Sequence, residues 1–265
     1  MSDAHAGQVT STAAEIYNQF FVPALFAEWA PRLCDAALIG EGQAVLDVGC
    51  GTGVATRAAS QRVGPTGAVT GVDINDGMLA VARGNDPDTT WQRAPAEKLP
   101  FEDDAFDAVV SQFALMFFDD PQQAIAEMNR VAKPGGQLAI AVWCSLSETP
   151  GYTAMAGLLG RLFGEEAAEA LRVPYTMGDP SELERLLRTA GLDATATTRP
   201  GTAVFPSIES WVHTDIRGWT LADMIDDEQF ERLQLAAQDE LQPFVRTDGT
   251  VAFEHPAIIV TATAR

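Results

Sequence analysis

A glycine-rich stretch and the acidic residues beside it are the part of this sequence best suited to chemistry. Asp47 ends a short apolar run, and Gly49, Gly51 and Gly53 follow at alternate positions. Glycine tolerates positive φ and lets a ligand approach the backbone, and the helix expected to begin near Val54 presents free N–H groups at its N-terminus. Such a loop suits the carboxylate or phosphate group of a ligand.

A second acidic residue indicates what kind of ligand this is. The next apolar run along the chain ends in Asp73, within the segment GVDIN. A carboxylate in that position can accept hydrogen bonds from both hydroxyls of a ribose. A glycine-rich turn alone could equally be a tightly packed turn, but together with Asp73 it predicts a site for a ribose-bearing cofactor.

The alternation of apolar runs predicts the elements that hold these residues. Between residues 43 and 143, short apolar runs alternate with helical patterns of about ten residues, which is typical of βαβ units with parallel strands and right-handed crossovers. Residues 13–37 carry apolar and aromatic side chains at three-to-four spacing, interrupted by Pro23 and Pro31. They predict two or three short helices.

The pattern changes after residue 143. A helix is expected over residues 181–190, with Ser181 and Glu184 at capping-box spacing, and strand-like runs follow at 194–205 and 251–264. We expect the last run to pair antiparallel with its predecessor. The 265 residues are then one domain, divided into N-terminal helices (1–42), a cofactor-binding core (43–143), cap insertions (144–179 and 206–249) and the end of the core sheet (180–205 and 250–265).

Four stretches occur in order between Val45 and Trp143: VLDVGCGTG, VTGVDINDGMLAVAR, APAEKLPFEDDAFDAVVS and EMNRVAKPGGQLAIAVW. With them the chain resembles the class I S-adenosylmethionine-dependent methyltransferases, and most of all the branch of quinone-ring C-methyltransferases and small-molecule methyltransferases. The resemblance implies an α/β fold with a Rossmann-like seven-stranded, mostly parallel sheet, its last strand antiparallel. It also implies helices on both faces of the sheet and a helical cap over the carboxyl ends of the strands.

The resemblance also implies an activity, the transfer of a methyl group from S-adenosylmethionine to a small organic acceptor by in-line displacement. It leaves open whether oxygen, carbon or nitrogen receives the methyl group. Several residues are implied to bind the methionine end of the cofactor or to close over it: Tyr17, Asp47, Gly49, Cys50, Gly51, Gly53, Ser111 and Gln112.

The adenosine end is implied to rest on residues of the next two strands. Asp73 binds the ribose, and Ile74 and Met78 enclose the adenine. The backbone of Ala96 and Glu97 reads the adenine edge. Where relatives often have Asp-Ala-Glu, residues 95–97 of this chain are Pro-Ala-Glu. The carboxylate that accepts from the adenine amino group is therefore missing, and backbone contacts or Glu97 have to replace it.

Two other kinds of protein remain as alternatives. A nicotinamide-dinucleotide fold also pairs a glycine turn with a later acid, but here the glycines are spaced GxGxG rather than GxGxxG and Asp47 precedes them. A catalytically silent module with the same fold would keep the cofactor site, and the proline at 95 and the lack of an evident base are compatible with it.

The acceptor site is less defined by the sequence. His213, flanked by Asp215 and Arg217, is a candidate general base, although a surface histidine would look the same. An apolar cap favours an aromatic or lipophilic acceptor. Its walls are expected from aromatic residues that could equally form the core of the cap: Tyr17, Phe20, Phe21, Trp29, Tyr152, Trp211 and Trp219.

Composition excludes several classes of partner. The net charge of −20 repels phosphate backbones, so nucleic acid is not expected as a substrate. Three scattered cysteines, and no signal peptide or membrane span, predict a cytoplasmic protein. No metal is expected, because Asp103, Asp104 and Asp107 lack the spacing and the glycine of a calcium loop. The oligomeric state stays open.

Overall fold

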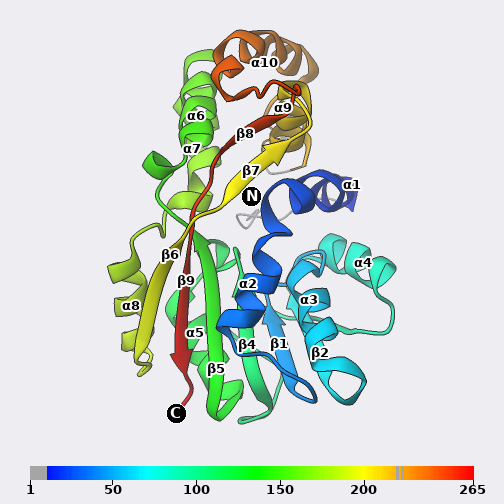
Figure 1. Ribbon diagram of the computed structural model, residues 1–265, viewed down its shortest axis with the longest axis vertical. Coiled ribbons are helices and arrows are strands. Elements are labelled where there is room, and N and C mark those ends of the chain that lie inside the picture. The colour runs from blue at the N-terminus through cyan, green and yellow to red at the C-terminus, as the bar shows by residue number, and fades with distance from the viewer. Residues whose placement is uncertain (1–10, 219–220, 222–223) are drawn as a thin grey trace, which may run out of the picture.

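The computed structural model describes residues 11–218, 221 and 224–265 of the chain. A seven-stranded sheet forms its lower half, with the strand order β3-β2-β1-β4-β5-β9-β6 (Figure 1). The sheet consists of β1 (Ala44–Val48), β2 (Ala68–Asp73), β3 (Thr90–Arg93), β4 (Phe106–Gln112), β5 (Ala132–Trp143), β6 (Ala194–Arg199) and β9 (Ala257–Thr263).

The direction of the strands follows from their connections. β1 pairs in parallel with β2 and with β4, and β4 pairs in parallel with β5. Parallel pairing is possible because a helix or a longer loop returns the chain to the same edge of the sheet before each new strand begins. β9 runs antiparallel to both β5 and β6. The predicted seven-stranded sheet with an antiparallel last strand is confirmed, and the carboxyl ends of the parallel strands all point toward the cap.

Helices cover both faces of this sheet. α2 (Trp29–Ala36) and α3 (Val54–Val63) contact each other on one face, and α5 (Pro121–Val131) and α8 (Pro180–Thr189) contact each other on the opposite face. α4 (Asp76–Asn85) packs on β2 and β3. With apolar cover on both sides, the central strands are buried almost throughout.

The N-terminal segment crosses the molecule between the sheet and the cap. It consists of α1 (Ser11–Ile16), the π-helix η1 (Tyr17–Phe26) and α2. The predicted short helices are thus confirmed, but Pro23 lies inside the π-helix instead of ending it. A π-helix is rare, and such segments are frequent at functional sites. Here it brings the aromatic side chains of its two ends together, with Tyr17 stacked on Phe26.

The two late strand-like runs do not stay in the core sheet. Each is interrupted, at Pro200–Gly201 and at His255–Pro256. On one side of the interruption the run lies in the core sheet, as β6 or β9, and on the other side it lies in a separate ribbon made of β7 (Thr202–Phe205) and β8 (Val251–Glu254). The expectation that residues 180–205 and 250–265 all belong to the core sheet is corrected in this respect. The ribbon carries the chain from the sheet up into the cap (Figure 1).

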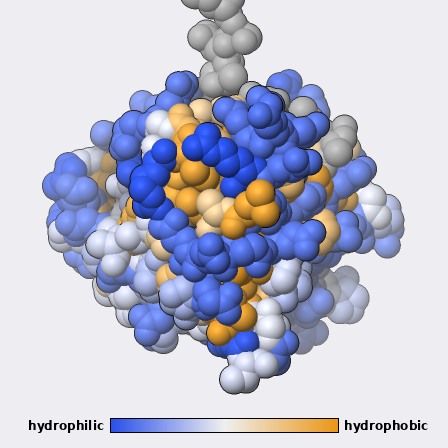
Figure 2. Space-filling view, turned by 90° about the horizontal axis from the view of Figure 1, so that it is seen from above, coloured by the Kyte–Doolittle hydropathy of each residue, from blue (hydrophilic) through white to orange (hydrophobic). Residues whose placement is uncertain are grey.

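The helical cap lies over the carboxyl ends of the strands. It contains α6 (Pro150–Phe163), α7 (Glu165–Arg172), α9 (Ile208–Arg217) and α10 (Asp227–Glu240). Seen from this end, hydrophilic side chains dominate and apolar ones gather near the middle (Figure 2). In the described part of the chain no helix is both long and apolar enough to cross a bilayer.

One helix start differs from the sequence prediction. The N-cap of α8 is Asp179, whose side chain accepts the Ser181 N–H at 2.8 Å. Glu184, predicted to complete a capping box with Ser181, instead accepts the N–H of Ala196 on β6 at 2.9 Å. The predicted capping box is therefore wrong, because Glu184 bonds the neighbouring strand.

Candidate functional site

A deep cavity opens at the carboxyl ends of β1, β2 and β4. Its volume is about 1050 Å³, including the part open to solvent. Of the residues predicted to bind the cofactor, all line this cavity except Gly53 and Ser111. Those that line it are Tyr17, Asp47, Gly49, Cys50, Gly51, Asp73, Ile74, Met78, Ala96, Glu97 and Gln112.

The three glycines of the loop serve different purposes. All have positive φ, but a Cβ on Gly49 would lie 2.4 Å from Ala114 Cβ, and one on Gly53 would lie 2.3 Å from the Trp91 ring. At Gly51 such an atom would meet nothing within 4 Å. Two glycines therefore allow close packing inside the protein, and Gly51 keeps the backbone accessible from the cavity.

Asp73 connects the ends of β2 and of the glycine loop. Its Oδ2 atom accepts the Gly51 N–H at 2.8 Å, and its Oδ1 atom accepts the Asn75 N–H at 2.8 Å. Burial raises the pKa of this carboxyl group, and the backbone N–H donors oppose the rise. The carboxylate lines the cavity, where its oxygens can also accept hydrogen bonds from a ligand such as the hydroxyls of a ribose.

Asp47 is a fully buried acid at the end of β1. Its Oδ2 atom accepts the Thr56 hydroxyl at 2.6 Å. Its Oδ1 atom has no hydrogen-bond partner among the described residues, and Asp47 lines the cavity. Burial raises its pKa to about 6. A buried acceptor without a donor is costly, so this atom is suited to receive a donor from a ligand, above all a cationic one.

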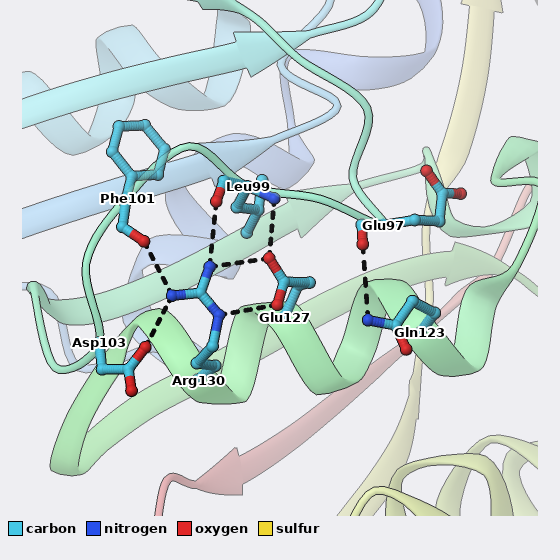
Figure 3. Close-up of polar contacts among 7 residues, drawn as sticks. All are labelled: Glu97, Leu99, Phe101, Asp103, Gln123, Glu127 and Arg130. Atoms are coloured by element: carbon cyan, nitrogen blue, oxygen red, sulfur yellow. Dashed lines mark hydrogen bonds and ion pairs between the residues drawn. The ribbon is translucent and has the colours of Figure 1, made fainter.

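The loop after β3 is held in place from below by α5. Figure 3 shows Arg130 donating to the carbonyl oxygens of Leu99 at 3.0 Å and Phe101 at 2.8 Å. The Glu127 carboxylate binds this guanidinium group and accepts the Leu99 N–H at 2.8 Å. Asp103 adds an ion pair to Arg130. This clamp fixes the loop that carries residues 95–97 into the cavity.

Glu97 is only partly available to a ligand. Its Oε1 atom accepts the Asp120 N–H at 3.2 Å, and its carbonyl oxygen accepts from the Gln123 amide at 3.5 Å (Figure 3). Ala96 is buried at the cavity wall. Ile74, which is 37% exposed, and the buried Met78 line the cavity from β2 and α4. These apolar surfaces suit a flat base.

A second cavity, which we call the acceptor chamber, adjoins the first beneath the cap. Its volume is about 530 Å³, again including open space, and Tyr17, Phe113 and Phe117 line both cavities. Aromatic rings make up most of its wall, and Asp215 is the one charged residue among the described residues that line it. The chamber's other lining residues are Phe21, Leu25, Phe26, Trp143, Tyr152, Ala170, Leu171, Pro174 and Tyr175.

Two buried hydrogen bonds lie at the cap side of the acceptor chamber. The Tyr152 hydroxyl on α6 donates to Asp215 Oδ1 on α9 at 3.1 Å. The Tyr175 hydroxyl and His255 Nε2 lie 3.0 Å apart, and the His255 ring stacks on Trp143. Burial lowers the pKa of His255 to about 3, so its imidazole is neutral at physiological pH.

His213 does not reach this site. Its ring meets Phe20 and Phe230 at centroid distances of 5.7 and 6.3 Å, and it lines neither cavity. The neighbouring acid, Asp215, binds Tyr152 instead. The pairing of His213 with Asp215 expected from the sequence is therefore absent from the described structure.

The aromatic residues expected to form the walls divide into two groups. Tyr17, Phe21 and Tyr152 line the acceptor chamber. Trp29 and Trp211 are fully buried in the core and Phe20 contacts His213, while Trp219 lies outside the described residues. Several other residues of the chamber belong to no motif that would single them out in the sequence, namely Phe26, Phe113, Phe117, Trp143 and Tyr175.

The acidic residues in the turn before β4 and at the start of β4 make structural contacts. Asp103 pairs with Arg130, and Asp107 pairs with Lys133 at 2.6 Å while accepting the Ala44 N–H at 2.8 Å. These contacts tie the turn to α5, β5 and the start of β1.

Comparison with known proteins gives the family. The family model described as a methyltransferase domain matches residues 46–140. The ubiquinone/menaquinone biosynthesis C-methyltransferase UbiE of Burkholderia mallei (strain SAVP1) is 35% identical over 207 residues, covering 71% of this chain and 84% of that protein. The YcgJ protein from Bacillus subtilis has a similar fold, with a TM-score of 0.62 at 19% identity over 90% of this chain and 98% of that chain.

A further structure of similar fold contains the cofactor. Phosphoethanolamine N-methyltransferase 2 of Haemonchus contortus, in complex with S-adenosyl-L-methionine, has a TM-score of 0.60 at 19% identity and covers 97% of this chain and 58% of that chain.

The chain belongs to the class I S-adenosylmethionine-dependent methyltransferases. Among these it is similar to the quinone C-methyltransferases. It is an enzyme that transfers the methyl group of S-adenosylmethionine to an acceptor.

Proposed function

We propose that this methyltransferase acts on a small, flat, lipophilic acceptor that binds in the acceptor chamber. The observation that carries the proposal is the contact between the two cavities, which share Tyr17, Phe113 and Phe117. A ligand enclosed by aromatic rings gains from apolar burial and from stacking. The Burkholderia relatives are named for ubiquinone and menaquinone biosynthesis, and a quinol-like ring would suit such walls.

The first cavity is proposed to bind the cofactor. Asp47 Oδ1, the buried acceptor that lacks a donor, would receive the ammonium group of the methionine end. The first turn of α3 and Gly51 would lie against its carboxylate, and Asp73 would bind the ribose hydroxyls. Gln112, whose Oε1 atom is buried without a partner in the described structure, lies beneath the methionine portion.

The remaining predicted contacts follow the same arrangement. Ile74 and Met78 enclose the adenine, the backbone at Ala96 and Glu97 reads its edge, and Cys50 and Tyr17 close the cavity. Gly53 and Ser111 do not line it, so we assign them to support: Gly53 allows Trp91 to pack, and Ser111 lies buried at the end of β4.

The cofactor supplies an electrophilic methyl group when it is bound, and the protein mainly positions the reactants. Phe113 and Phe117, at the junction of the cavities, would direct the acceptor toward the first cavity and exclude water from it. Tyr17 would hold both ligands at once, because it lines both cavities.

We also propose that nucleic acid is not a substrate and that the enzyme works in the cytoplasm. The charge of −20 supports the first statement. Three cysteines that are free and buried, Cys34, Cys50 and Cys144, suit a reducing compartment.

Calorimetry with S-adenosylhomocysteine, followed by a turnover screen against phenols, quinols and aliphatic alcohols, tests the proposal. We expect cofactor binding in the micromolar range and turnover only with flat aromatic acceptors. Binding without turnover on any acceptor would favour the silent module instead. Absence of cofactor binding would overturn the assignment of the first cavity.

A further inference from the structure

The Asp215 side chain stands in surroundings that are unusual for a carboxylate. It is 1% exposed and lines a chamber otherwise walled by apolar and aromatic groups. Tyr152 donates to its Oδ1 atom, whereas its Oδ2 atom has no hydrogen-bond partner in the described parts of the chain. Burying a carboxyl group that has one oxygen without a partner is expensive, so a group kept in this state needs a reason beyond packing.

No cationic group of the described chain compensates this carboxylate. The titratable groups near it are Tyr152 from α6 and Tyr175 from η5 (Val173–Tyr175), with Tyr17 across the chamber. His255, at the junction of β8 and β9, contacts the rings of Tyr152 and Tyr175. Arg217, two residues along α9, points away and pairs with Asp227 at 2.6 Å. The neighbours of Asp215 are therefore neutral.

The proton affinity of Asp215 follows from these surroundings. Burial raises its pKa to about 8, and the interactions with the Tyr152 hydroxyl and the Trp211 side chain oppose the rise. The carboxylate is thus a much stronger base than an exposed aspartate, and its proton affinity comes closer to that of a phenol.

We propose that Asp215, oriented by Tyr152, accepts the proton of an aromatic hydroxyl group on the acceptor and so activates it for methyl transfer. The proposal rests on the proposed function and specifies its acceptor as a flat phenol or quinol. Asp215 Oδ2 is the atom that receives the hydroxyl proton, and Tyr152 is a positioning residue that holds the carboxylate through Oδ1.

The reaction balances with these groups alone. The hydroxyl O–H bond breaks, its proton moves to Asp215 Oδ2, and its electron pair remains on the oxygen and is shared with the ring. A pair on that oxygen, or on a conjugated ring carbon, forms the bond to the methyl carbon. The bond between the methyl carbon and sulfur breaks, and its pair stays on the sulfur, which leaves neutral. Attack by carbon ends with loss of the ring proton to water.

Binding of two probes tests the recognition of the hydroxyl group without any turnover. With S-adenosylhomocysteine present, calorimetry compares 2-naphthol with 2-methylnaphthalene, which has a methyl group in place of the hydroxyl. We expect the native protein to bind 2-naphthol about tenfold more tightly. D215L should abolish this preference, and D215N, which keeps a hydrogen-bond acceptor of the same shape, should retain most of it. Equal binding of both probes by the native protein would overturn the proposal.

Turnover and its pH dependence test the proton transfer itself. Turnover of 2-naphthol, or of the phenol found in the screen, should rise with pH up to about 8, because the base must be ionised, and D215N should lose about a hundredfold or more. Tyr152→Phe removes the hydrogen bond that lowers the pKa of Asp215, so the midpoint should move to higher pH. Turnover that falls as pH rises through 8, or D215N at the native rate, would contradict the proposal.

His213→Ala provides the matched control on the same helix. The His213 ring lines neither cavity, so both the probe preference and the turnover should stay within about twofold of the native values. Equal losses in His213→Ala and D215N would show general damage to α9 and overturn the specific role of Asp215. Normal cofactor binding in every variant separates a failure of this proposal from a failure of the proposed function.

Discussion

The backbone N–H of Gly51 donates to Oδ2 of Asp73 across 2.8 Å, which joins the loop after β1 to the end of β2. The two residues lie 22 positions apart, and the parallel pairing of β1 with β2 brings them together. Asp73 therefore has two tasks, since it orders the loop and also presents lone pairs to the cavity.

Asp73→Asn should weaken nucleoside binding strongly. The amide can still accept from one backbone N–H, but its NH₂ group faces the second backbone donor and loses the acceptors for the ribose. We expect the affinity for S-adenosylhomocysteine and for adenosine alone to fall by about 10- to 100-fold, measured by calorimetry. Unchanged adenosine binding would refute the ribose assignment.

Asp47→Asn should raise the stability of the protein and at the same time weaken cofactor binding. The folded-state pKa of Asp47 is about 6 against an ordinary 3.8, so the ionised form destabilises the fold. This destabilisation is absent below about pH 4, develops between pH 4 and 6 and is complete above 6. The variant should therefore be more stable than the native protein by about 1–3 kcal/mol at pH 7 and equal to it near pH 4, in chemical denaturation.

The same substitution should lower the affinity for S-adenosylhomocysteine by about tenfold. The affinity for adenosine should stay unchanged, because adenosine lacks the ammonium group. Asp239→Asn, at an exposed site on α10, is the control and should change neither quantity. A loss of stability in Asp47→Asn at pH 7 would contradict the burial argument.

Two alanine substitutions in the glycine loop should have opposite consequences. Gly53→Ala places a methyl group against the Trp91 ring at φ +85°, so it should cost about 2–4 kcal/mol of stability. Gly51→Ala meets open space, so it should cost only about 1–2 kcal/mol, from its positive φ.

Gly51→Ala should nevertheless lower cofactor affinity more than tenfold, because the added methyl group occupies space next to the cavity. Thermal unfolding and calorimetry on both variants check these expectations. A Gly51 variant that binds the cofactor normally would show that the ligand does not approach the loop there.

Arg130→Ala should release the loop after β3. It removes the hydrogen bonds to the carbonyl oxygens of Leu99 and Phe101, so we expect a loss of about 1–3 kcal/mol in stability and a threefold to tenfold loss in adenosine affinity. Hydrogen exchange should increase at residues 95–103. Arg188→Ala, which removes an ion pair 3.8 Å long at the surface of α8, is the control, and an equal effect there would argue against a specific clamp.

The sequence by itself determined the cofactor half of this protein. Asp47, Gly51 and Asp73 are placed by local rules, because a glycine loop joins a strand to its helix and the ends of neighbouring parallel strands meet at one edge. Their arrangement therefore follows from spacing along the chain. The strand-like composition of residues 194–205 and 251–264 was also visible in the sequence. Where each run leaves the core sheet depends on packing, because a Cβ on Gly201, at one of the two interruptions, would lie 2.2 Å from the Trp29 ring.

Only the tertiary structure decided the acceptor half. Asp215 and Tyr152 lie 63 positions apart on two cap helices, and no local rule pairs them. His213 and Asp215 are two residues apart, and on α9 this spacing turns their side chains about 200° from each other, so Asp215 faces the chamber and His213 does not. The sequence shows that a helix is present, but the docking of the cap against β5, β8 and the π-helix selects the face that is buried.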